Sequence, residues 1–185
     1  MKGLASFALV LAVGLVVVVS LTSTGGDRPR MNVHALGPEY SLDELWDAAE
    51  IVAVVVPTGK QVERWNNSTN TMWEAPKDSG ILPMVYRDEE VLVITVLKGL
   101  PASLLTLRNL GGIADGVEFV YDGLYDLKTG ERYLVFLETV QAPTQDGVEQ
   151  AISFVAQGQG LFSAIGGGFQ NALGRTLTLE ELTSR

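Results

Sequence analysis

A chain of 185 residues is long enough for one domain and a targeting segment. Its 22 acidic residues outnumber 13 basic ones, and the formal charge of −9 argues against binding to nucleic acid or to anionic lipid through a basic patch. The chain has no cysteine, which excludes disulfides, thiolate metal ligands and cysteine nucleophiles. His34 is the only histidine, so neither a zinc site nor a Ser-His-Asp triad is expected.

Residues 1–22 begin with Met-Lys and continue as an uncharged apolar run, which predicts an N-terminal hydrophobic helix. Two interpretations stay open: a cleaved signal peptide, or an uncleaved membrane anchor of about 20 apolar residues. Both place the rest of the chain outside the cytoplasm, either membrane-anchored or secreted. Residues 23–40 contain Ser, Thr, Gly and Pro without apolar periodicity, which is typical of a flexible linker. The folded domain is therefore expected over residues 41–185.

The domain is predicted to open with a short helix. Ser41 and Glu44 have the spacing of a capping box, in which each side chain accepts a hydrogen bond from the backbone amide of the other residue. Residues 51–56 follow as a β-branched run that predicts a strand, and Pro57 is expected to end it.

The stretch of residues 91–99 predicts the central strand of the domain. Its side chains are apolar on both faces of an extended chain, so we expect both faces to be covered. Gly99 and Pro101 are expected to end this strand, because glycine permits the turn and proline cannot donate to a ladder.

Further short strands with turns between them predict a mostly β fold. Residues 133–137 form a second run that is apolar on both faces, and we expect it to neighbour the first. Residues 151–156 and 161–165 are predicted to form a hairpin, and a second capping box at Thr178 opens a last helix. The pattern predicts a small closed barrel with short flanking helices, which leaves no exposed strand edges. The remaining predicted strands are residues 104–110 and 117–121.

The least regular segment, residues 59–82, contains two tryptophans. A long connection without periodicity is usually functional or mobile. Trp65 and Trp73 are therefore candidate ligand-binding residues on an exposed platform. The alternative is that both rings pack back over the barrel, since large aromatic side chains are mostly buried.

Two groups of carboxylates are candidates for chemistry. Asp115, Glu118, Asp122 and Asp126 form a candidate Ca²⁺ site, because hard cations prefer several oxygen ligands from a tight loop. The spacing is not that of an EF-hand, and the alternative is a set of solvated acidic turns. The second group, residues 88–90, comprises Asp88, Glu89 and Glu90 and supplies candidate acids for a hydrolase that also uses an acid from the first group.

Several short motifs carry a resemblance to a known family, and they lie at residues 49–54, 96–99, 130–137, 158–162 and 179–182. They resemble the netrin-like family, whose members include metalloproteinase inhibitors, and in particular uncharacterised exported bacterial proteins with this pattern. The resemblance covers residues 41–185 and implies an OB-type barrel. The inhibitors place an N-terminal cysteine on the protease zinc, so their activity and site residues do not transfer to this cysteine-free chain.

These observations predict a non-enzymatic binding module outside the cytoplasm. Its expected partner is a protein or a glycan at the cell surface. If the N-terminal segment stays uncleaved, we expect that segment to bind the membrane as well. No cofactor is expected beyond the candidate Ca²⁺. The alternatives are a carboxylate-dependent hydrolase of the cell envelope and a purely structural envelope protein. An OB-type fold does not choose among them, since one fold hosts many functions.

Overall fold

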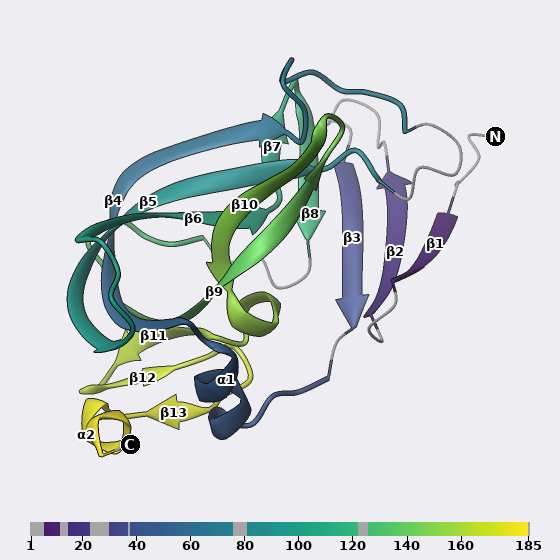
Figure 1. The fold of residues 1–185 in the computed structure, drawn as a ribbon. Coiled ribbons are helices and arrows are strands. Elements are labelled where there is room, and N and C mark those ends of the chain that lie inside the picture. The colour runs from purple at the N-terminus through teal and green to yellow at the C-terminus, as the bar shows by residue number, and fades with distance from the viewer. Residues whose placement is uncertain are drawn as a thin grey trace.

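The structure, a computed structural model, describes residues 6–11, 15–22, 30–36, 38–75, 81–121 and 126–184. It is mostly β with one large sheet, in agreement with the predicted class (Figure 1). The elements, in chain order, are β1 (Ser6–Leu11), β2 (Leu15–Thr22), β3 (Arg30–Leu36), α1 (Leu42–Ala48), β4 (Ile51–Trp65), β5 (Val85–Lys98), β6 (Leu104–Leu110), β7 (Gly112–Ala114), β8 (Val117–Tyr121), β9 (Tyr133–Thr144), β10 (Gly147–Phe154), the 3₁₀ helix η1 (Val155–Gly158), β11 (Leu161–Ile165), β12 (Gly168–Gln170), β13 (Thr176–Leu177) and α2 (Leu179–Thr183).

The large sheet bends until its strands nearly enclose an interior. Its order is β10-β6-β5-β4-β9-β11-β12-β13, and β10 also pairs with β9. The β9–β10 pairing is antiparallel and extends over the whole of β10. By contrast, β10 and β6 run parallel and share a single register pair, Ile152 with Leu107. The ring formed by β4, β5, β6, β10 and β9 is therefore not a cleanly closed barrel, because β6 and β10 meet at one residue pair. We call this junction the β6–β10 seam.

Strand β9 lies between two apolar clusters. Leu134 and Phe136 point to one side and Val135 and Leu137 to the other, and all four are 0% exposed. The central cluster fills the interior bounded by β4, β5, β6, β9 and β10, and consists of Ala53, Val55, Val91, Leu105, Leu107, Tyr133, Val135, Leu137, Phe154 and Leu161. The helix-side cluster packs α1, η1 and α2 onto the opposite face of β9, and consists of Leu45, Ala49, Val52, Val54, Leu134, Phe136, Val155, Phe162, Phe169, Leu177 and Leu182.

The prediction that both faces of residues 91–99 are covered is wrong. Val91 is 0% exposed in the central cluster, but Leu92, Ile94 and Val96 are 43%, 50% and 46% exposed. Nor does β5 neighbour β9, because β4 lies between them. Periodicity cannot distinguish these cases, since an apolar stripe left in solvent has the same pattern as a covered one. The strand that is buried on both faces is β9.

Two predicted strand boundaries are also corrected. Pro57 does not end β4, which continues to Trp65, because the register shifts between Pro57 and Gln61 and this irregularity tolerates a residue without an amide hydrogen. Residues 151–156 and 161–165 do not pair with each other. Instead β10 forms its hairpin with β9, and β11 pairs with the other edge of β9 through Leu161 and Val135.

The predicted N-terminal hydrophobic helix is not confirmed. The described parts of residues 1–22 are the strands β1 and β2, which pair antiparallel with each other. Within residues 23–40, predicted as a linker, β3 pairs with β2 and runs parallel to β8. No helix among the described residues combines the length and apolar character needed to cross a membrane. The division into residues 1–22, 23–40 and 41–185 stays a prediction.

Both predicted capping boxes are confirmed. The Glu44 amide donates to Ser41 Oγ at 3.2 Å, and the Ser41 amide donates to Glu44 Oε2 at 2.7 Å. The same reciprocal pair joins Thr178 and Glu181 at the start of α2. Each box fixes a short helix that contributes one fully buried leucine to the helix-side cluster, Leu45 from α1 and Leu182 from α2.

The turn after β5 provides a test of backbone strain. Gly99 and Gly130 both have a φ of +81°, which costs an L-residue about 1–2 kcal/mol. A Cβ at Gly99 would lie 2.4 Å from the backbone oxygen of Glu50, whereas a Cβ at Gly130 meets nothing within 4 Å. We expect Gly99→Ala to lower the free energy of unfolding in urea by about 3 kcal/mol or more, and Gly130→Ala by about 1 kcal/mol. Equal losses would contradict the close approach to Glu50.

Candidate functional site

The two candidate ligand-binding tryptophans lie in the interior. Trp65 is 0% exposed and packs with Val85, Phe119 and Tyr121, and Trp73 is 8% exposed. An exposed platform made of these two rings is therefore not present. The structure has the alternative arrangement, in which both rings pack back onto the sheet.

The tryptophan-bearing segment is ordered by one buried amide. Asn66 is 0% exposed, and its Oδ1 accepts hydrogen bonds from Trp73 Nε1 and from the Met84 amide, each at 2.9 Å. Its Nδ2 donates to the backbone oxygens of Leu82 at 2.9 Å and Pro143 at 3.3 Å. The Asn66 side chain thus joins both ends of the β4–β5 connection to the end of β9.

The candidate Ca²⁺ ligands do not gather in the described part of the chain. Asp115 lies in the turn between β7 and β8 with a φ of +52°, Glu118 pairs with Arg30 at 3.5 Å, and Asp126 pairs with Arg87. Asp122 lies outside the described residues. Among the residues that are described, no three His, Asp or Glu side chains are arranged to hold a metal ion. The Ca²⁺ site stays a prediction without support from this geometry.

The carboxylates at residues 88–90 alternate between the two faces of β5. Asp88 and Glu90 point outward. Asp88 belongs to a polar network on the outer face, and Glu90 forms an exposed ion pair with Lys60 at 3.1 Å. Glu89 points into the sheet interior and is 4% exposed. Of the three alternative acids for the predicted hydrolase, Glu89 therefore lies on one face of the strand, and Asp88 and Glu90 lie on the other.

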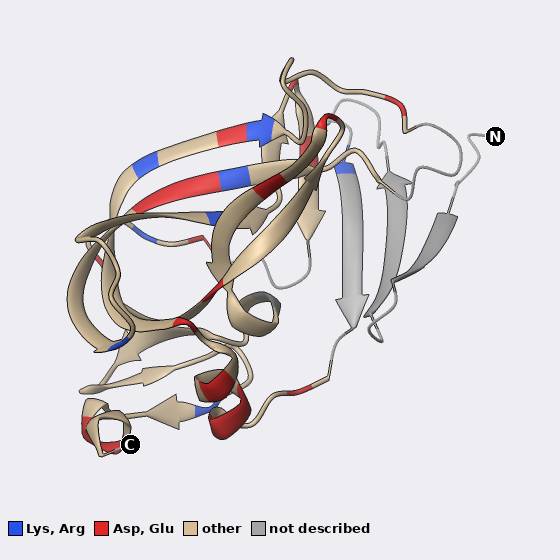
Figure 2. Ribbon diagram, in the orientation of Figure 1, with Lys and Arg blue, Asp and Glu red and all other residues tan. Residues whose placement is uncertain are grey.

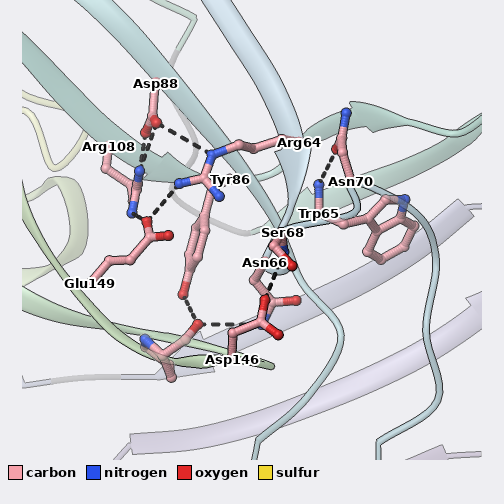
Figure 3. A network of polar contacts seen from close by, with 11 residues as sticks. Arg64, Trp65, Asn66, Ser68, Asn70, Tyr86, Asp88, Arg108, Asp146 and Glu149 are labelled. Atoms are coloured by element: carbon pink, nitrogen blue, oxygen red, sulfur yellow. Dashed lines mark hydrogen bonds and ion pairs between the residues drawn. The ribbon is translucent and has the colours of Figure 1, made fainter.

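The outer network joins four charged side chains from four strands (Figure 3). Arg108 donates two hydrogen bonds to Asp88, both at 2.7 Å, and a third to Glu149 at 2.7 Å. Arg64 donates to the same Glu149 carboxylate at 2.6 Å. These hydrogen bonds hold the pKa of Glu149 below its usual value, and Arg108 also lies 5.0 Å from the centre of the Tyr86 ring. Two positive and two negative charges balance, so the network carries no net charge, and its charge-assisted hydrogen bonds fix the positions of the four side chains relative to one another.

Glu89 is the most perturbed acid of the described chain. Burial raises its pKa from 4.5 to about 7; the nearby Arg87 opposes the shift, and Asp126 and Glu63 add to it. Asn109 on the neighbouring strand also opposes the shift, and Glu89 Oε2 has no hydrogen-bond partner among the described residues. Arg87 itself binds Glu63 at 2.8 Å, and Glu63 accepts from the Ile113 amide. The interior therefore holds a carboxyl group whose pKa is raised well above its usual value by burial.

An open hollow of about 500 Å³ lies beside the outer network, at the β6–β10 seam. Leu104 and Ile152 contribute apolar surface, whereas Thr106, Thr139 and Gln150 contribute hydrogen-bonding groups. Asp88 and Arg108 form a charged wall whose positions are fixed by the bonds described above. Glu89 does not line this hollow. The complete lining is Asp88, Leu104, Leu105, Thr106, Arg108, Thr139, Gln150, Ala151 and Ile152.

Strand β5 is charged in one half and apolar in the other (Figure 2). Residues 87–90 carry four charges, and no further charge occurs before Lys98. The exposed Leu92 of the apolar half lies directly opposite Leu104, which is 45% exposed and lines the hollow. An exposed apolar surface is therefore continuous with the hollow.

Sequence reasoning missed Arg64, Arg108 and Glu149, and with them the hollow. The three residues lie on separate strands, 85 positions apart at the extremes, and no local motif connects them. The sequence did contain one signal of this network. Asp88 and Arg108 carry opposite charges at outward positions of β5 and β6, and the two residues lie directly across from each other. That signal becomes visible only when the pairing of the two strands is known.

Comparisons of this chain with models of protein families, with curated proteins and with solved structures find no match. The resemblance to the netrin-like family therefore stays a prediction.

The raised pKa of Glu89 predicts how stability changes with pH. Between pH 4.5 and about 7 the unfolded chain has released this proton while the folded chain keeps it. The unfolded state then binds fewer protons, so the free energy of unfolding falls as pH rises, by about 3 kcal/mol across this window. Glu89→Gln cannot ionise, and we expect its stability relative to the wild type to rise by that amount between pH 4.5 and 8.

The matched control is Glu90→Gln, on the exposed face of the same strand. Lys60 and Thr58 lower the pKa of Glu90, so this variant should show no such rise above pH 5. Chemical denaturation across the pH range measures both variants. Parallel curves for wild type and Glu89→Gln would show that Glu89 titrates normally.

Proposed function

We propose that this chain is a non-enzymatic binding module of OB-like architecture that acts outside the cytoplasm. Its ligand is a protein or a glycan, and it binds in the hollow at the β6–β10 seam. The observation that carries the proposal is the lining of that hollow, where apolar surface and hydrogen-bonding groups stand beside a charged pair. Binding sites commonly have volumes of roughly 300–1,000 Å³ and combine apolar walls with a few fixed polar groups.

The fixed wall distinguishes this hollow from an ordinary surface depression. Arg108 is 12% exposed along its side chain and makes three hydrogen bonds, so its position does not depend on a ligand. A ligand therefore meets a preformed polar edge and loses little free energy to ordering it. The partly open ring of five strands supports the OB-like assignment, because the OB class is itself a partly open five-stranded barrel.

Location outside the cytoplasm is supported by the sequence of residues 1–22. That segment serves either as a signal peptide or as a membrane anchor. The acidic composition supports a partner other than nucleic acid.

A binding screen with the full chain tests the proposal. The probes are a glycan array and a displayed library of random twelve-residue peptides. Thr106→Trp places a large ring in the hollow from an exposed position, and Thr176→Trp makes the same change at an exposed position in β13. We expect wild type and Thr176→Trp to bind the same ligands, and Thr106→Trp to bind them at least about tenfold more weakly.

Two outcomes would overturn the proposal. Binding that survives Thr106→Trp would place the ligand elsewhere. No binding by the wild type would favour a purely structural protein, the alternative that the buried tryptophans also fit.

The second candidate, a carboxylate-dependent hydrolase, is favoured by one observation. Glu89 has a pKa of about 7 and lies in the field of Asp126, which matches a general acid poised near neutral pH. Its burial and its absence from the hollow count against access of a substrate. Chromogenic glycosides and esters test this candidate, and hydrolysis that is lost in Glu89→Gln would establish it in place of the binding module.

A further inference from the structure

We infer that the occupant of the hollow is an extended peptide segment of a partner protein, which adds to the free edge of β6 at residues 104–106. This inference rests on the proposed function and names the ligand class and the binding mode. It follows from the backbone of β6, from the apolar surface beside the hollow and from the charges at its sides.

The backbone of β6 has an unpaired edge at the hollow. The Val93 amide donates to the Ser103 oxygen at 2.9 Å, and the Gly111 amide donates to the Val85 oxygen at 2.8 Å, so the odd-numbered positions of β6 face β5. Because backbone groups alternate along a strand, those of Leu104 and Thr106 point the other way, toward β10.

At the seam, β10 meets β6 only at the pair of Ile152 with Leu107. The two strands then diverge, and the hollow lies between Leu104–Thr106 on one side and Gln150–Ile152 on the other. Because the backbone of Leu107 faces β5, this pair engages the Thr106 oxygen and the Arg108 amide beside it. No further register pair joins β10 to β6 among the described residues, which leaves the Thr106 amide and both backbone groups of Leu104 on the unpaired part of this edge. A free strand edge that lines a hollow is the feature that binds an extended peptide through main-chain hydrogen bonds.

The apolar surface selects the side chains of the occupant. Every second side chain of an added strand would point to the outer face, where the exposed Leu92 and Leu104 lie opposite each other. Ala151 and Ile152 provide apolar contact across the hollow. The structure therefore favours a peptide with apolar residues at alternate positions.

The charges on the two sides of the hollow differ. On one side, Asp88 and Arg108 neutralise each other. On the β9 side of the hollow, Thr139 Oγ1 donates to Glu50 Oε2 at 2.7 Å, and Glu50 has no cationic partner among the described ion pairs. Its charge, together with the net charge of −9, favours a lysine or arginine on the peptide near Thr139. A glycan would use neither the strand edge nor this carboxylate in the same way.

The test uses the full chain and the peptides captured from the displayed library, synthesised with a single N-methyl group at each position in turn. N-methylation removes one amide donor and leaves the side chain unchanged. We expect every second position to lose about tenfold or more in affinity, with the positions between them nearly unaffected. The amides of Leu104 and Thr106 should exchange with deuterium about tenfold more slowly in the complex, whereas those of Leu105 and Leu107, already turned toward β5, should not change.

Charge complementarity is tested with Glu50→Gln, which retains the hydrogen bond from Thr139. We expect affinity for the captured peptides to fall about three- to tenfold, with a weaker dependence on salt. Glu39→Gln, exposed and away from the hollow, is the control and should bind as the wild type does.

The outcomes separate this inference from the proposed function. Capture of glycans alone, lost in Thr106→Trp, would overturn strand addition and leave the binding module standing. Captured peptides that tolerate N-methylation at every position would do the same. If the wild type captures neither class, or if Thr106→Trp binds as well as the wild type, both proposals fail.

Discussion

The fold depends on burying one strand segment, Tyr133–Leu137, on both faces. Its five side chains are 0–3% exposed and divide between the central and helix-side clusters. Full burial of such a side chain contributes roughly 1.5–3 kcal/mol to the stability of the folded protein, and all five side chains of this segment are buried. Both faces must be covered at once, so the sheet bends around one face and the short helices α1 and α2 pack against the other. Neither helix has the length to be stable alone, and each is held by its capping box and one buried leucine.

The outer side of the sheet is organised by a different constraint. Where β6 and β10 diverge, they share a single backbone pair, and the cross-strand hydrogen bonds of Arg108 add to the apolar contacts of Leu107 and Phe154 in the central cluster. Arg108 connects β5 and β6 to β10, so the seam stays in register although it has a single backbone pair. The same side chains form one wall of the hollow. Structural and binding roles therefore overlap at this residue, and a loss of Arg108 would affect both.

Local features of the sequence were predictable because their causes are local. The capping boxes at Ser41 and Thr178 require only residues three positions apart, and the mostly β class follows from short alternating runs. The neighbours of each strand were not predictable in this way. The run at residues 91–99 and the run at residues 133–137 have the same apolar pattern, yet only the second is covered on both faces. The hollow could not be predicted for the same reason. Its wall is formed by residues from separate strands, and no spacing rule in the sequence relates these residues to one another.

The burial of Asn66 also has a consequence for production of the protein. Asn66-Asn67-Ser68 and Asn67-Ser68-Thr69 are overlapping acceptor sequences for N-linked glycans. In the folded protein the side-chain nitrogens of both asparagines already donate hydrogen bonds. Asn66 Nδ2 donates to the backbone oxygens of Leu82 and Pro143, and Asn67 Nδ2 donates to the backbone oxygen of Thr71 at 2.9 Å. A sugar replaces one of the two hydrogens on such a nitrogen and so removes one of its bonds, and both side chains are buried, at 0% and 4% exposed. Modification must therefore precede folding, and it then prevents the β4–β5 connection from closing. Eukaryotic secretory expression would therefore yield a glycosylated fraction that cannot reach the native state, whereas a host without this modification avoids the loss.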